Sequence, residues 1–343
     1  MPIQICRLLA FDGPNIAAPQ PGVLLHALGP ADASAALRAA LKEAAQRAGV
    51  VIGALDTSAA RRGGSFLLSA SFTTPTPELG AAVARLAVDW LNADEAGEEA
   101  DAYEEALWEL QRRRRASALP LAALQLTARA QSLNLPAFVR DDGALQIGSG
   151  VRSWSIELDR LRARPHTEPI ALAMPEVPWE RIGAVPLVAV TGGRARDAVV
   201  EEVAAALRRA GAAVSAATQA PFDAVGRLLA DPSAEVIVVG LEAEDLLRRG
   251  LPFTGCVCSA VLGLPEPPAV WHEPEELARA VCLPALVTAA DGIALLDAGA
   301  PEIVELAEYA AAPTVLLGPE PDPRRLAALA AREILARLEG LLA

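Results

Sequence analysis

The sequence predicts an α/β protein in which a small α+β N-terminal domain is followed by a doubly wound parallel sheet. Two observations predict this fold. Strand-like and helix-like segments alternate over the first 95 residues, as in a small α+β domain. From Leu187 onward, short apolar runs alternate with helical patterns, and the run AEVIVVG (234–240) is typical of a strand buried in a parallel sheet.

The N-terminal domain is expected to contain two strands and two helices. The strands are expected at 3–11 and 65–72, and the helices between Pro30 and Gly49 and over 76–93. Asp32 or Ser34 is the expected N-cap of the first helix, and Gly49 should end it. In the second helix, Leu79, Val83, Leu86 and Trp90 recur at helical spacing.

A third helix is expected at 96–115. Its acidic residues come first and four arginines (112–115) come last, an order that complements the helix dipole. These arginines could hold an acidic partner or polymer, or they could form a solvated helix end. A helix and two short strands should follow over 118–150. The proline-rich stretch 162–186 contains the expected boundary, so the predicted domains are 1–118, 119–167 (a remnant and linker) and 168–343.

The C-terminal domain should alternate strands and helices. Strands are expected at 187–190, 212–218, 234–240, 256–264, 285–297 and 313–319, with helices ending at Gly211 and spanning 221–232, 273–281 and 301–310. The tail from Pro323 to Leu342 should form a long amphipathic helix. Its apolar face could cap the sheet or dock on a second subunit, so we expect an oligomer.

Composition narrows the classes of partner. The chain has 343 residues, a formal net charge of -13 and a pI of about 4.8, which disfavours a nucleic-acid or anionic-membrane surface. No apolar stretch approaches the about 18 residues that cross a bilayer. The four cysteines form no paired framework, and together with the absence of a signal-peptide pattern they indicate a cytoplasmic protein.

The segment VPLVAVTGGRARDAVVEEVAAALRRAGAAV (185–214) has the pattern of a phosphate-binding loop. It places an apolar strand before a glycine turn and a helix, where backbone N–H groups can approach an anion. The candidate ligand-binding residues are Thr191, Gly192, Gly193, Arg194 and Arg196. Arg196 stands where such loops carry lysine, and Asp197 beside it would serve well as the N-cap of the helix. The alternative, which we favour, is an ordinary helix start with solvated arginines.

Five stretches, in order, resemble segments of the cyanophycin synthetase family. They are RLLAFDGPN (7–15), SLNLPAFVRDDGALQIGSGVRSWSIELDRLRA (132–163), RIGAVPLVAVTG (181–192), DPSAEVIVVGLEAEDLLRRGLPFTGC (231–256) and DGIALLDAGAPEIVELAE (291–308). The second resembles the start of that family's ATP-grasp domain, and the last three resemble its Mur ligase-like domain. The resemblance implies a Mur ligase-like, P-loop-type fold for the C-terminal domain and a relationship to enzymes that join aspartate and arginine at two ATP-dependent sites.

The same resemblance implies that the chemistry of these sites has been lost. The family loop V-A-V-T-G-T-N-G-K-T-T keeps its first glycine as Gly192, whereas Arg196 takes the lysine position and Asp197 the Mg²⁺-binding threonine position. Arginine retains the charge but does not fit a lysine slot. A family glutamate falls on Gly240, with Glu242 and Glu244 on a shifted register.

The other family sites are also incomplete. Only the opening of the ATP-grasp domain, about 119–165, is present. The N-terminal metallopeptidase-like site of some members needs H-x-x-E-H, but the equivalent helix has no histidine and only Glu43. No new catalytic pattern stands out, and Cys256 and Cys258 are interpreted as buried thiols rather than a metal or redox pair. We therefore expect no catalytic residue, no bound metal and no cofactor.

These observations predict a catalytically inactive protein that acts as an accessory or structural subunit of a cyanophycin-type ligase. The expected partner is a second copy of the chain or a full-length synthetase. One alternative is an altered enzyme that binds a phosphate- or carboxylate-bearing substrate through Arg194 and Arg196. Another is a module that binds a peptide or polymer through its N-terminal domain.

Overall fold

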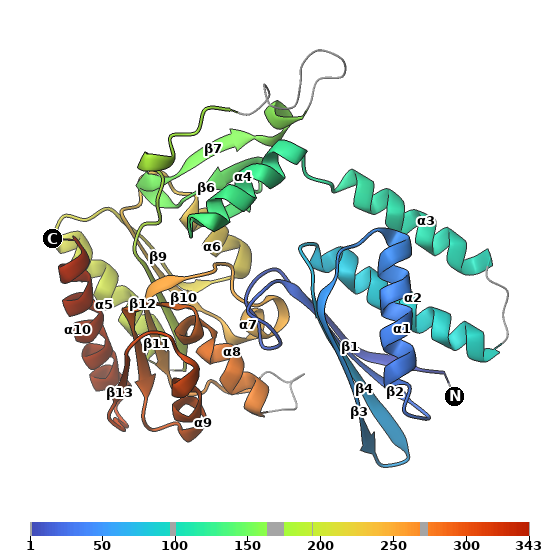
Figure 1. Cartoon of the computed structure of the whole chain (residues 1–343). Helices are drawn as coiled ribbons and strands as arrows, with labels where there is room; N and C mark the ends of the chain where they lie inside the picture. Colours follow the sequence, from blue (N-terminus) through green and yellow to red (C-terminus); the bar gives the residue numbers. More distant parts are fainter. Residues whose placement is uncertain (1, 97–100, 163–174, 194, 268–273, 343) are drawn as a thin grey trace. The chain divides into compact units, whose positions relative to one another are not determined.

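The computed structural model describes residues 2–96, 101–162, 175–193, 195–267 and 274–342 (Figure 1). The chain forms two compact units. The first comprises residues 1–118 with 248–250, and the second comprises 119–247 with 251–343. The boundary predicted at residue 168 lies outside the described residues. No helix among the described residues has both the length and the apolar character that a membrane crossing requires.

The first unit is a four-stranded antiparallel sheet with helices on one face. The strand order is β1-β2-β4-β3. Its elements are β1 (Gln4–Phe11), β2 (Gly22–Gly29), α1 (Ser34–Ala48), β3 (Gly53–Arg62), β4 (Ser65–Thr73), α2 (Pro77–Ala96) and α3 (Asp101–Ala116). Leu25 and Leu68 from the sheet pack with Leu41 of α1 and Val83 of α2 in one apolar core. The helices thereby bury the apolar face of the sheet.

The sequence-based prediction missed two strands of this sheet. In β2, His26 interrupts the apolar run on the face away from the core, and β3 is an edge strand rich in alanine, serine and threonine, so neither shows a regular alternation of apolar and polar residues. The N-cap prediction for α1 was also wrong. Ala33 is the N-cap, and the Asp32 carboxylate accepts hydrogen bonds from the backbone and hydroxyl of Ser34 instead. Gly49 ends the helix in a left-handed conformation, as predicted.

The second unit contains a six-stranded parallel sheet with the order β13-β12-β11-β8-β10-β9. The strands are β8 (Leu187–Gly192), β9 (Val214–Ala220), β10 (Val236–Leu241), β11 (Cys256–Leu262), β12 (Thr288–Asp297) and β13 (Thr314–Leu317). The helices are α5 (Arg196–Arg209), α6 (Phe222–Leu229), α7 (Ala243–Arg249), α8 (Pro274–Leu286), α9 (Pro301–Val304) and α10 (Pro323–Leu342). The predicted α/β class with a parallel sheet is confirmed.

Helices cover both faces of this sheet. On one face, Val188 and Val190 of β8 pack against Val199 of α5 and Ile334 of α10. On the other face, Thr191 contacts α8 through a hydrogen bond to Val281. The apolar side of α10 is thus buried against the sheet and α5, which is the first of the two roles that the sequence left open. Helix α7 was not predicted, and α8 continues through Pro284 to Leu286, where a strand had been expected from residue 285.

A smaller layer completes the second unit. It contains α4 (Leu121–Ser132) and the antiparallel sheet β5-β6-β7, whose strands are β5 (Ala137–Val139), β6 (Ala144–Ile147) and β7 (Trp154–Glu157). Leu126, Leu145 and Ile147 form its separate apolar core. Gln146 also donates a hydrogen bond to the Leu229 carbonyl at 3.0 Å, which ties this layer to the helix before β10.

Candidate ligand pocket at the carboxyl ends of the parallel strands

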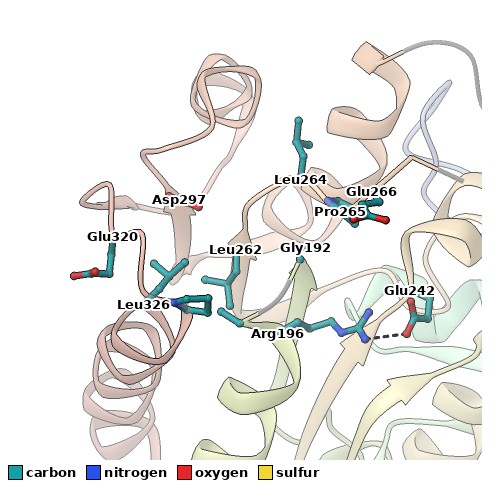
Figure 2. A pocket seen from close by; sticks show the side chains of 13 residues that line it. Gly192, Arg196, Glu242, Leu262, Leu264, Pro265, Glu266, Asp297, Glu320 and Leu326 are labelled. Carbon is teal, nitrogen blue, oxygen red and sulfur yellow. Dashed lines mark ion pairs between the residues drawn. The ribbon is translucent and has the colours of Figure 1, made fainter.

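A pocket of about 530 Å³ lies where β8, β11 and β12 end (Figure 2). It is lined by Gly192, Gly193, Ala195, Arg196, Glu242, Leu262, Leu264, Pro265, Glu266, Asp297, Glu320, Pro323 and Leu326. After β8 the chain continues to β9, at one edge of the sheet. After β11, the strand next to β8, it continues to β12, toward the other edge. Crevices at such switch points are the usual ligand sites of open α/β sheets.

Gly192, at the end of β8, forms the floor of the pocket. Its φ of +105° lies in a region that residues with a side chain rarely adopt. A Cβ at this position would lie 2.6 Å from the Gly263 carbonyl oxygen and 2.7 Å from backbone atoms of Leu262. The fold therefore requires glycine here because β8 and β11 approach closely, whether or not a ligand binds.

At Gly193 the backbone leaves room for a side chain, unlike at Gly192. A Cβ at Gly193 would meet the Leu264 carbonyl oxygen at 3.5 Å, an ordinary van der Waals contact. Its backbone N–H donates to the Leu262 carbonyl at 3.0 Å. A phosphate-binding loop needs such N–H groups aimed at the anion, and in this turn that donor already has a backbone partner.

Thr191 points away from the pocket. The side chain is fully buried, and its hydroxyl donates to the Val281 carbonyl of α8 at 2.6 Å. The structure therefore brings Gly192, Gly193 and Arg196 to the pocket and directs Thr191 into the sheet–helix interface. Arg194 lies outside the described residues.

Arg196 is buried and paired, although its position at the start of a helix had favoured a solvated side chain. Only 10% of the side chain is exposed. Nε donates to Asp197 Oδ1 at 2.7 Å, Nη1 donates to the Leu241 carbonyl at 3.2 Å, and Nη2 lies 2.9 Å from Glu242 Oε1. Figure 2 shows the side chain reaching across to Glu242. The guanidinium thus links the start of α5 to the end of β10.

In the cluster of Arg196, Asp197 and Glu242, hydrogen bonds favour the charged forms of Arg196 and Asp197. Burial opposes the charged form of Arg196, but the hydrogen bonds that the guanidinium donates to Glu242 and Asp197 outweigh it, so the pKa of the guanidinium is raised. Partial burial likewise opposes ionised Asp197, but bonds from Arg196 and from Gln219 of β9 hold the pKa of that carboxyl below its ordinary value. The guanidinium thus lies between two carboxyl groups, those of Asp197 and Glu242.

Asp197 is not the N-cap of α5. That position is Ala195, which has an unstrained φ of -89° and ψ of -14° and provides no side-chain cap. Asp197 sits in the first helical turn, where its negative charge is favourable to the helix dipole. Its carboxylate turns toward Arg196 and Gln219, because the buried guanidinium is a stronger partner than a backbone N–H.

Gly240 occupies a place that cannot accept a side chain. A Cβ there would lie 2.0 Å from the Thr218 carbonyl oxygen, at an irregularity in the pairing of β9 with β10. A glutamate at this position would break that contact between strands. The next carboxylate along the chain is that of Glu242, two residues later, and it is paired with Arg196.

Sequence reasoning missed the opposite wall of the pocket. Asp297 ends β12, Glu320 follows β13 and Leu264 follows β11. The signal was present in the order of the elements, because the carboxyl ends of parallel strands share one edge of a sheet. Polar residues placed directly after predicted apolar strands would therefore have identified this wall.

The fold and the pocket define an α/β protein with an open parallel sheet and a ligand-sized crevice at its switch point. The chain belongs to the family described as Domain of unknown function (DUF4938), whose model matches residues 2–318. No curated protein matches the sequence. The family description states no activity, so the relationship to cyanophycin synthetase stays a prediction.

Proposed function

We propose that this protein is a non-catalytic binding protein on a Mur ligase-like scaffold, acting as an accessory or structural subunit of a cyanophycin-type, ATP-dependent amino-acid ligase. The observation that carries the proposal is the pairing of Arg196 with Asp197 and Glu242. A cation that grips a transferring phosphate must offer its charge to the ligand. Here that charge is balanced from within the protein.

The surroundings of Arg196 support the same proposal. Phosphoryl transfer relies on backbone donors, a cation and Mg²⁺-binding groups arranged around the phosphates. The Gly193 N–H bonds to a strand, Asp197 stands where a hydroxyl would bind Mg²⁺, and Gly240 leaves no room for a carboxylate. These changes affect the turn after β8, the first turn of α5 and strand β10, so replacing one residue does not restore the site.

The proposal is tested by calorimetry and an ATPase assay on the full chain. We expect no Mg²⁺-dependent ATP hydrolysis and no ATP binding, in the unaltered protein or in Arg196→Lys. Lysine cannot span Asp197, the Leu241 carbonyl and Glu242 together, and it leaves the other changes in place. Micromolar ATP binding by either protein would show that the loop still works and would overturn the proposal.

The accessory role is tested separately by light scattering at micromolar concentration, with the protein alone and mixed with a cyanophycin synthetase. A complex, either of two copies or with the synthetase, is expected. Monomers in both samples would remove the accessory role and favour the altered enzyme. That alternative needs an anionic substrate to displace Glu242 from Arg196, so phosphate and dicarboxylic acids belong in the same calorimetric series.

A further inference from the structure

The pocket has the size and position of a small-molecule site. Its volume of about 530 Å³ falls within the roughly 300–1,000 Å³ typical of such sites. It opens at the carboxyl ends of the strands, where open α/β sheets bind ligands. Loss of the phosphate chemistry therefore leaves a cavity whose walls define a different ligand.

Carboxylates from three separate segments stand around this cavity. Glu266 follows β11, Asp297 ends β12 and Glu320 follows β13. Asp297 Oδ1 accepts the Gly299 backbone N–H at 2.8 Å, and Glu320 Oε1 accepts that of Asp322 at 3.1 Å. Within the described part of the chain, no arginine or lysine forms an ion pair with these three carboxylates. Their combined field repels an anion and attracts a cation.

The arrangement fits an extended organic cation better than a metal ion. Among the described residues, no three of the aspartates, glutamates, histidines and cysteines are grouped closely enough to hold a metal. Figure 2 shows Asp297 and Glu320 toward one end of the pocket and Glu266 toward the other, whereas Glu242 is paired with Arg196. Apolar side chains of Leu262, Leu264 and Leu326 line the space between them.

We propose that this pocket binds a linear di- or polyamine, with ammonium groups near the carboxylates and methylene segments against the leucines. The inference rests on the proposed function in one respect, namely that the site does not take a nucleotide. Charge-assisted hydrogen bonds to carboxylates would position the ammonium groups. The apolar wall would bury the methylene chain, which contributes free energy without requiring further polar groups.

Calorimetric titration of the full chain with spermidine tests this proposal. We expect one site per chain. Asp297→Asn should weaken binding by about tenfold or more, the loss expected when a charge-assisted hydrogen bond is removed. The matched control is Asp291→Asn, because Asp291 is exposed near the amino end of the same strand and the charge change is identical. It should change affinity less than about twofold, and thermal unfolding establishes that both variants are folded.

Equal weakening by the two variants would show general attraction to an acidic protein and would overturn the proposal. So would the absence of binding heat with spermidine, or binding of Mg²⁺ alone at the same residues. Parallel titration with ATP distinguishes a failure of the amine site from a failure of the proposed function. ATP binding contradicts the proposed function, whereas silence with both ATP and spermidine contradicts only the amine site.

Discussion

The floor of the pocket, formed by Gly192 and Leu262, differs from its polar end, formed by Arg196 with Asp197 and Glu242. The floor is fixed by backbone contact between β8 and β11 and by a positive φ. The polar end is fixed by charges that pair with each other. The most loop-like residue, Gly192, is thus required by packing, whether or not a ligand binds.

The largest effect is expected at the floor. Gly192→Ala should lower the free energy of unfolding by about 3 kcal/mol, because the new methyl group meets backbone atoms that cannot move aside and φ becomes strained. Gly193→Ala is the matched control in the same turn and should change it by less than about 0.5 kcal/mol. Urea denaturation followed by circular dichroism measures both. Equal losses would mean that the two glycines are not distinguished by packing.

A smaller loss is expected at the polar end. Arg196→Met should cost about 1–3 kcal/mol, because Asp197, Glu242 and the Leu241 carbonyl lose a shared partner. This expected loss is smaller than for a fully buried ion pair, because both carboxylate side chains are 41% exposed. Arg209→Met, at the exposed end of the same helix, should stay within about 0.5 kcal/mol of the unaltered protein. A neutral Arg196→Met would show that the cluster adds no stability.

The pairing of Asp197 should appear as a pH dependence. The folded-state pKa of this carboxyl is lowered, so its stabilising contribution is complete above the unfolded pKa of about 3.9 and disappears as pH falls through the folded value. The unaltered protein should therefore be more stable than Asp197→Asn at pH 7, with the difference shrinking below about pH 4. Denaturation curves at several pH values test this, and a difference that grows toward low pH would contradict it.

The smallest effect concerns the thiols of the sheet. Burial raises the pKa values of Cys256, Cys258 and Cys282 to about 12, whereas Cys6 of the first unit is exposed. At pH 8 a thiol reagent should modify Cys6 and leave the other three until urea unfolds the chain. Labelling of Cys258 in the native protein would mean that β11, which supports the floor, opens readily.

Sequence patterns predicted the strands best where both faces of a strand are buried under helices. β8, β10 and β11 consist largely of consecutive apolar residues, which indicates strands with helices on both faces. β3 gave no such signal, because an edge strand of small polar residues resembles a loop. The short helix α7 lacks a full apolar period, and Pro284 gave a false end to α8.

The pocket was predictable only in part. The strand–turn–helix at Gly192 followed from local pattern, but the partner of Arg196 depends on which strands are neighbours. Glu242 comes directly after β10, and only the adjacency of β10 and β8 places it beside Arg196. The opposite wall of the pocket was missed for the same reason, because Asp297 and Glu320 are distant from Gly192 in sequence. Long-range strand order determines both.

The strand order also has a consequence for the order of assembly during synthesis. β8 is the first strand of the parallel sheet to be made, yet it lies in the middle, with β10 on one side and β11 on the other. Its apolar face is shared by α5 and α10, and α10 is made last of these elements. In a chain emerging from the ribosome, Val188 and Val190 can therefore contact α5 early but lack their contact with α10 until late. Such long-range pairing slows folding and makes this interval the one in which a chaperone would matter most.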